Sequence, residues 1–267
     1  MNALVSTSGY AGMAQPRSSA RLASKLGLGI AILAMAVVMA AGGLATASVI
    51  AWGPATDVSG DSDVSTSGTL VAAYSLGNNP NSGNTNTVNG VDFTPVAITA
   101  SAPGPASVSF GGDTLTSDAV SGYDHFGAPA SFTAAYQSLL TSAAYESTGN
   151  IADPLVLTLN NLTVGRQYQF ETWVNDTRSF GASRNETVGS SGDSVTLAFQ
   201  TGTLAAGQFV LGTFTADSTG SQVIAFTGNQ DAQINAFQLR AVPEPAALGL
   251  LAIGGLGLLL LKQRRMA

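Results

Sequence analysis

What the sequence lacks excludes several chemistries. The chain of 267 residues contains no cysteine and one histidine, His125. Without cysteine there can be no disulfide framework, thiol nucleophile or thiolate metal site. One histidine cannot supply a histidine-rich zinc site, and the sequence has no Gly-x-Ser-x-Gly elbow, His-Glu-x-x-His pair or phosphate-cradling loop. These absences argue against the common hydrolase, zinc-protease and nucleotide-binding classes.

Glutamate is also scarce in the middle of the chain, where it occurs only at Glu146, Glu171 and Glu186. A glycoside hydrolase needs two carboxylates that face each other across a cleft, and sequence spacing alone does not reveal such a pair. We therefore expect a protein that is not an enzyme and has no catalytic residues. A glycoside hydrolase or lyase is kept as the third hypothesis.

Positive charge is almost absent between residues 48 and 242. This region contains four arginines, no lysine and fifteen acidic residues, which gives a formal charge of −11. Such a surface repels nucleic acid and anionic polymers unless cations bridge them. We expect no nucleic-acid partner.

The amino-terminal segment has the organisation of an export signal. Basic residues without any acidic residue precede an apolar run at 26–44, and Ala45-Thr46-Ala47 follows it. Signal peptidase cuts after two small residues that are separated by one residue. Here the two small residues are Ala45 and Ala47, and the cut follows Ala47. We predict that residues 1–47 are a signal peptide with a signal helix. The length of the run leaves a retained membrane anchor as an alternative, and in both cases Ser48 onward lies outside the cytoplasm.

The carboxyl-terminal segment, residues 242–267, has three parts. Val-Pro-Glu-Pro is followed by an apolar run at 246–261 and then by a basic end. As a helix, this run would be roughly 24 Å long, slightly short of the hydrocarbon core of about 30 Å, so it is a plausible transmembrane helix. The basic end would stay in the cytoplasm. The residues expected to act in sorting or processing are Val242, Pro243, Glu244, Pro245, Arg264 and Arg265.

This order of motif, apolar run and basic end resembles the PEP-CTERM sorting signal of Gram-negative bacteria. The resemblance covers the tail alone. It implies an exosortase substrate that is tethered to the inner membrane and then moved to the cell surface or the medium. Proline keeps the Pro-Glu-Pro segment out of a helix or sheet, so an enzyme could read it in extended form. The alternative is an ordinary membrane anchor whose prolines begin the helix.

Residues 48–241 are predicted to form one extracytoplasmic all-β domain. Short segments rich in Val, Thr, Phe and Tyr alternate with Gly, Asn, Ser and Asp clusters, which is typical of an antiparallel β-sandwich or jelly roll. Asn89-Gly90 favours a type I′ hairpin turn. The expected strands are 49–52, 69–75, 87–88, 91–94, 106–110, 155–159, 167–175, 195–200, 209–216, 222–227 and 233–240.

One helix is expected among these strands. Apolar residues from Phe132 to Ala143 recur at the spacing of one helix face, with Ser131 as the candidate N-cap. The residues from Leu159 to Tyr168 resemble the corner of fibronectin-III-like sandwiches, in which a tyrosine hydroxyl fixes the arch. The strand that follows alternates between two faces, with Trp173 and Asn175 opposite Tyr168.

Two constellations suggest binding sites. Asp57, Asp61 and Asp63 place three hard oxygen donors on one loop, as Ca²⁺ prefers, although the spacing is not that of an EF-hand. The alternative is that these aspartates cap turns of their own backbone. Apart from this possible Ca²⁺ we expect no cofactor.

The second constellation combines an aromatic ring with hydrogen-bonding groups, the composition of a sugar-binding surface. The alternative is a buried tryptophan with a loop contact between Asp176 and Arg178. The residues are Trp173, Asn175, Asp176, Arg178 and Arg184.

These patterns together predict an exported, non-catalytic β-sandwich protein of the cell surface or extracellular matrix, associated with exopolysaccharide. The alternative function is a carbohydrate-binding module. The expected partners are signal peptidase and exosortase as processing enzymes, the membrane, and polysaccharide.

Overall fold

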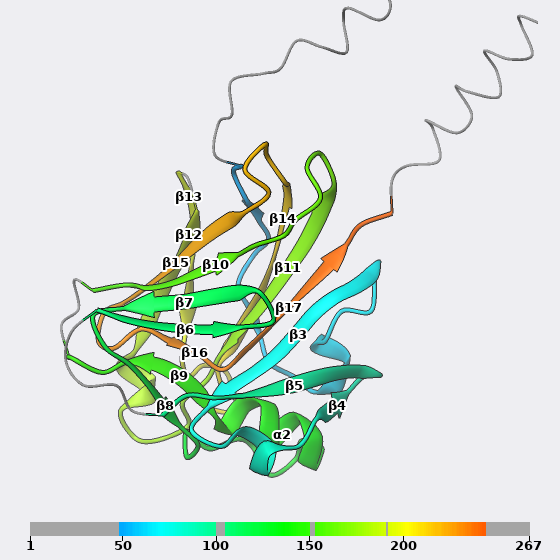
Figure 1. Ribbon diagram of the computed structural model, residues 1–267. Helices are drawn as coiled ribbons and strands as arrows, with labels where there is room; N and C mark the ends of the chain where they lie inside the picture. Colours follow the sequence, from blue (N-terminus) through cyan, green and yellow to red (C-terminus); the bar gives the residue numbers. More distant parts are fainter. Residues whose placement is uncertain (1–47, 100–104, 150–152, 191, 244–267) are drawn as a thin grey trace, which may run out of the picture. The chain divides into compact units, whose positions relative to one another are not determined.

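A computed structural model describes residues 48–99, 105–149, 153–190 and 192–243 (Figure 1). Within these ranges no helix is long and apolar enough to cross a membrane. The predicted signal peptide with Ala45 and Ala47, the apolar run at 246–261, and Glu244, Pro245, Arg264 and Arg265 lie outside the described residues.

The described residues form seventeen strands and one α-helix. The strands are β1 (Ala51–Trp52), β2 (Thr56–Asp57), β3 (Thr69–Gly77), β4 (Asn86–Val88), β5 (Val91–Ala97), β6 (Ala106–Phe110), β7 (Asp113–Ser117), β8 (Val120–Tyr123), β9 (Ala143–Glu146), β10 (Leu155–Leu159), β11 (Gln167–Val174), β12 (Asn185–Ser190), β13 (Asp193–Ala198), β14 (Gln208–Thr215), β15 (Gln222–Gly228), β16 (Gln233–Ile234) and β17 (Ala236–Ala241). The helix is α2 (Ala134–Thr141), and the 3₁₀ turns are η2 (Asp61–Asp63), η3 (Pro80–Gly83) and η4 (Gly181–Ser183).

The strands form two large sheets and one small one. The first has eight strands in the order β1-β14-β11-β17-β3-β5-β4, with β2 also paired to β14. The second has six strands in the order β13-β12-β15-β10-β7-β6, and the third joins β16, β9 and β8. The strands pair antiparallel except β3 and β5, which are parallel and so depart from the expected all-antiparallel pairing.

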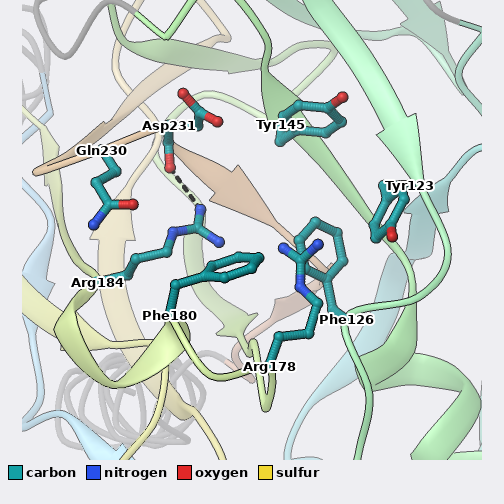
Figure 2. Close-up of a pocket in the computed structure, with 8 residues that line it drawn as sticks. All are labelled: Tyr123, Phe126, Tyr145, Arg178, Phe180, Arg184, Gln230 and Asp231. Carbon is teal, nitrogen blue, oxygen red and sulfur yellow. Dashed lines mark hydrogen bonds between the residues drawn. The ribbon is translucent and has the colours of Figure 1, made fainter.

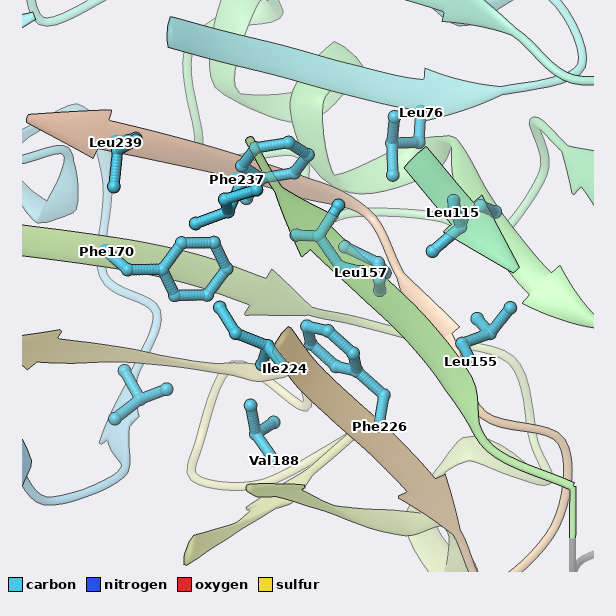
Figure 3. Close-up of a cluster of buried hydrophobic side chains, with 14 of the residues drawn as sticks. Leu76, Leu115, Leu155, Leu157, Phe170, Val188, Ile224, Phe226, Phe237 and Leu239 are labelled. Atoms are coloured by element: carbon cyan, nitrogen blue, oxygen red, sulfur yellow. The ribbon is translucent and has the colours of Figure 1, made fainter. Parts of the chain in front are cut away.

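The main core lies between the two large sheets (Figure 3). Phe170 and Phe237 come from the eight-stranded sheet, and Leu157, Ile224 and Phe226 come from the six-stranded sheet. All five side chains are fully buried. Two facing sheets around one apolar core are the β-sandwich that the alternating sequence pattern predicts.

A second core covers the outer face of the eight-stranded sheet. Trp173 of β11 packs edge-on against Phe93 at 5.9 Å and stacks with Phe209 at 6.2 Å between ring centroids. Helix α2 contributes Tyr136 and Leu139 to the same cluster. Both faces of β11 are therefore buried, which alternation alone does not predict because one face carries Gln169, Glu171 and Asn175.

Polar side chains fix residues 65–68 onto that outer face. Ser65 donates its backbone N–H to Glu171, and the Gln238 amide donates to the same carboxylate and to the Ser65 carbonyl. Arg240 donates to the carbonyls of Thr66, Ser67 and Gly68. Burial is the main cause that raises the pKa of Glu171 to about 7.

Several local expectations are confirmed. Asn89 and Gly90 both have positive φ, at 48° and 75°, as a type I′ turn requires. The Tyr168 hydroxyl accepts the Thr163 N–H at 2.9 Å, which is the predicted corner contact. The predicted N-cap of the helix, Ser131, is wrong. The N-cap is Thr133, whose hydroxyl accepts the Tyr136 N–H, and the helix therefore begins at Ala134.

Candidate functional site

A pocket of about 280 Å³ lies where the third sheet meets the loop after β11 (Figure 2). Its walls combine aromatic rings with two arginines, an amide and a carboxylate. The lining residues are Tyr123, Phe126, Tyr145, Arg178, Phe180, Arg184, Gln230 and Asp231. This aromatic–arginine pocket is the candidate site.

The aromatic wall comes from three separate segments. Tyr123 ends β8, Tyr145 lies in β9, and Phe180 immediately precedes η4. Phe126 is buried beneath them, with its ring centroid 5.0 Å from that of Tyr123 and 6.5 Å from that of Tyr145. Tyr123 and Tyr145 are partly exposed and Phe180 is 49% exposed, so ring surface is available to a ligand.

Arg178 is fixed at the centre of this wall. Its Nε and Nη2 both donate to the Asp176 carboxylate at 2.8 Å, a bidentate pair. Its guanidinium lies 4.3 Å from the Phe180 ring centroid and 4.5 Å from that of Phe126. Because the side chain is still 30% exposed, it can reach a ligand from a position that is already set.

Arg184 also lines the pocket and is almost fully buried. Its Nη1 donates to Asp176 at 2.7 Å and to Gln233 at 3.1 Å, and its Nη2 donates to the Asp231 carbonyl at 2.8 Å. The guanidinium also lies 4.1 Å from the ring centroid of Phe199. A single buried carboxylate, Asp176, therefore holds both arginines, and this sharing fixes their positions relative to each other.

The loop reaches this geometry because a glycine permits a close approach. A Cβ at Gly181 would lie 1.8 Å from the Asp176 carbonyl oxygen, so no other residue fits there without movement. Across the pocket, Phe126 is held by its N–H to the Thr141 carbonyl at 3.0 Å and by its own carbonyl, which accepts the Thr177 N–H at 2.8 Å. The loop that contains Gly181 and the segment that contains Phe126 are therefore both held in place by backbone contacts.

Two acids at or near the pocket, Asp231 and Glu186, have raised pKa values. Burial raises the pKa of Asp231, nearby Glu146 raises it further, and Arg184 opposes the rise. Burial also raises the pKa of Glu186 to about 8, against the Gln233 N–H that its carboxylate accepts at 2.8 Å and the charge of Arg184. The protonation of these two acids is therefore set by burial, which favours the neutral form, and by specific partners, which favour the charged form.

The structure brings together three of the five residues predicted for sugar binding. Asp176, Arg178 and Arg184 meet at the pocket, but Trp173 is fully buried in the second core and offers no stacking surface. Asn175 is also buried, donates to the carbonyls of Gly127 and Leu140, and accepts the Gly207 N–H. The buried tryptophan and the Asp176–Arg178 contact are the alternative that the sequence had left open.

Sequence reasoning missed the rings that do line the pocket. Tyr123 and Phe126 flank the only histidine, and that aromatic-rich segment was the available signal. Tyr145 and Phe180 carry no local signal, because they become neighbours only through tertiary structure.

The three aspartates considered for Ca²⁺ have separate partners. Asp57 accepts from Gln208, Asp61 from Thr133, and Asp63 from Ser59, Gly60 and Tyr136. Among the residues described, no group of three or more His, Cys, Asp or Glu side chains is placed to hold a metal ion.

The tail leaves the fold at the end of the central strand β17. Ala241 pairs with Tyr168 of β11 and Thr69 of β3, and the Val242 N–H donates to the Gln167 carbonyl at 2.9 Å. Pro243 is exposed.

Comparison with known proteins identifies a motif in this tail. Residues 241–265 match the PEP-CTERM protein-sorting motif. Neither the curated proteins nor the solved structures give a significant match to the chain. The chain therefore carries at its carboxyl end the PEP-CTERM motif of exported proteins that exosortase sorts.

Proposed function

We propose that this chain is a non-catalytic component of the cell surface or extracellular matrix, and that its β-sandwich binds a sugar unit of exopolysaccharide in the aromatic–arginine pocket. The observation that carries the proposal is the lining of the pocket, in which partly exposed aromatic rings flank an arginine fixed by a carboxylate. Rings pack against the apolar face of a sugar, and fixed polar groups hydrogen-bond its hydroxyls.

The charges of the pocket favour an uncharged sugar. Arg178 and Arg184 are both paired with the Asp176 carboxylate, Asp231 adds a carboxylate to the lining, and residues 48–242 as a whole carry −11. An acidic polysaccharide would be repelled by that field. The volume of about 280 Å³ is just below the usual range of small-molecule sites, which begins at about 300 Å³. One neutral sugar unit of a longer chain is therefore the ligand that fits best.

The position of the pocket also suits a tethered protein. Strand β11 runs from Gln167, which bonds Val242, to Val174, two residues before Asp176. Its eight residues span about 23 Å at the usual rise of a strand. The pocket and the tail thus lie at opposite ends of the same strand, so polysaccharide can be bound at one end while the other is attached.

The arrangement of the carboxylates supports a binding function and argues against a hydrolase function. Asp231 lines the pocket, but Asp176 is engaged by two arginines. Glu146, Glu171 and Glu186 are at most 1% exposed. A glycosidase needs two carboxylates that both reach the scissile bond.

The test measures binding of the mature protein to exopolysaccharide isolated from the producing cells. Phe180→Ala removes an exposed ring from the pocket, and we expect binding about fivefold weaker, since ring stacking contributes about 1 kcal/mol. Leu204→Ala is the matched control, because Leu204 is similarly exposed, at 43%, and does not line the pocket. Equal affinity of the two variants would contradict the proposal.

A further inference from the structure

The end of the sandwich from which the tail departs has a defined surface. It comprises residues 160–166 between β10 and β11, residues 216–221 between β14 and β15, and Val242; we call it the tail-exit end. Backbone hydrogen bonds join these segments, from Leu162 N–H to the Gly220 carbonyl at 2.9 Å and from Gly165 N–H to the Ala216 carbonyl at 2.8 Å. This surface is part of the folded domain.

No spacer separates this surface from the sorting motif. The motif match begins at residue 241, which is the last residue of β17 and is 1% exposed. Strand β17 lies between β11 and β3, and Arg240 is bound to three backbone carbonyls. Freeing more chain for an enzyme would mean breaking the centre of the larger sheet.

An enzyme that holds the motif must therefore touch the domain. Residues 243–245 span about 10 Å even when fully extended. A single α-helix with its side chains is already about 10–12 Å wide. Any structural element that grips Pro-Glu-Pro consequently abuts the residues around Val242.

The surface at that point is suited to contact. A hollow of about 450 Å³ is lined by Thr163, Val164, Gly165, Arg166 and Val242. Val164 is 58% exposed, the highest value among the large exposed apolar side chains of the described residues. Arg166 adds one of only four positive charges in residues 48–242. Arginine is enriched at protein–protein interfaces, and an exposed apolar side chain beside it gains free energy when a partner covers it.

We propose that the exosortase recognises the motif together with the folded tail-exit end, and that residues 163–166 form the contact surface for this enzyme. The folded domain then contributes to sorting, and the linear motif is one part of a larger recognition surface. This inference is independent of sugar binding.

The experiment follows processing of the full-length chain in the producing cells by pulse-chase and intact mass. Val164→Asp and Arg166→Glu should each slow loss of the tail about fivefold, which corresponds to about 1 kcal/mol of contact energy. Leu204→Asp, an equally drastic change at an exposed apolar residue outside this end, should leave the rate unchanged. Unfolding midpoints of the mature forms check that all variants fold.

A second variant tests the same idea without altering the surface. Three Gly-Ser pairs inserted between Val242 and Pro243 should also slow processing about fivefold, because the spacer moves the motif away from its contact surface. Unchanged or faster processing of the spacer variant would overturn the proposal, as would an unchanged rate for Val164→Asp.

Two controls separate the remaining outcomes. The combined change Pro243→Ala, Glu244→Gln and Pro245→Ala should abolish processing; if it does not, the motif is not read and the docking proposal fails with it. If Val164→Asp slows processing only by releasing the full-length chain from the membrane fraction, the surface contacts lipid and the proposal is overturned.

Discussion

The pocket end and the tail-exit end of the sandwich are organised by different forces. At the pocket end, buried charges hold one another, as in the fully buried Asp176 carboxylate shared by Arg178 and Arg184. At the tail-exit end, backbone hydrogen bonds and one tyrosine hydroxyl close the corner, and Val164 is exposed. The first arrangement fixes the positions of polar side chains that line a pocket. The second fixes the backbone beside the end of β17.

The largest difference between the ends should appear when an arginine is neutralised at each. Arg184→Met removes hydrogen bonds to Asp176, Gln233 and the Asp231 carbonyl in a buried site. We expect the free energy of unfolding to fall by about 3–5 kcal/mol, as when one partner of a buried pair is lost. Arg166→Met at the tail-exit end should change it by less than about 0.5 kcal/mol. Urea unfolding measures both, and equal losses would contradict the comparison.

A pH effect should follow from the buried acids. The pKa of Glu186 is about 8 in the fold against an ordinary value of 4.5, so the folded state holds a proton that the unfolded state has released. Stability should therefore fall as pH rises between these values, by about 3 kcal/mol from pH 5 to pH 8 for this group. Glu171, with a pKa of about 7, acts in the same direction.

Glu186→Gln separates the two contributions, since it removes the titration and keeps a similar shape. The variant should show a shallower loss of stability across pH 5 to 8, with the part due to Glu171 remaining. A profile identical to that of the parent protein, measured by urea unfolding at each pH, would show that Glu186 is not the titrating group.

A smaller effect is expected at the tail-exit end from Tyr168→Phe. The change removes the acceptor for the Thr163 N–H and leaves the ring stacked on Phe214, at 5.6 Å between centroids. We expect a loss of about 1 kcal/mol, the usual contribution of one hydrogen bond. Amide hydrogen exchange at Thr163 should also become faster; unchanged exchange would mean that this bond does not hold the corner.

Sequence alternation predicted the inner sheet faces well and failed where polar residues are buried. Strand β12 is not among the strands that the sequence predicts, because Asn-Glu-Thr-Val-Gly-Ser has one large apolar residue, Val188, and its other fully buried side chain is Glu186. Strand β7 has the same difficulty, with Leu115 as its only large apolar residue. A single apolar residue does not establish a period of two.

The candidate site was predictable only in part, for a related reason. Asp176, Arg178 and Arg184 are close in sequence, so local composition found them. Their aromatic partners come from β8, β9 and η4, which the small third sheet and the loop after β11 bring together. The sorting motif, in contrast, is wholly linear, and its prediction was confirmed.

Sugar binding at the pocket end is tested most directly by NMR of the arginine side chains. Residues 48–243 contain only four arginines, so each arginine Nε–H signal can be assigned to one known position in the fold. Arg178 and Arg184 report the pocket, and Arg166 and Arg240 report the tail side of the fold. On titration of the mature protein with neutral oligosaccharides released from the exopolysaccharide, the Arg178 and Arg184 signals should shift in a saturable way while the Arg166 and Arg240 signals stay in place. No shift at Arg178 under saturating oligosaccharide, or shifts confined to Arg166 and Arg240, would contradict the account.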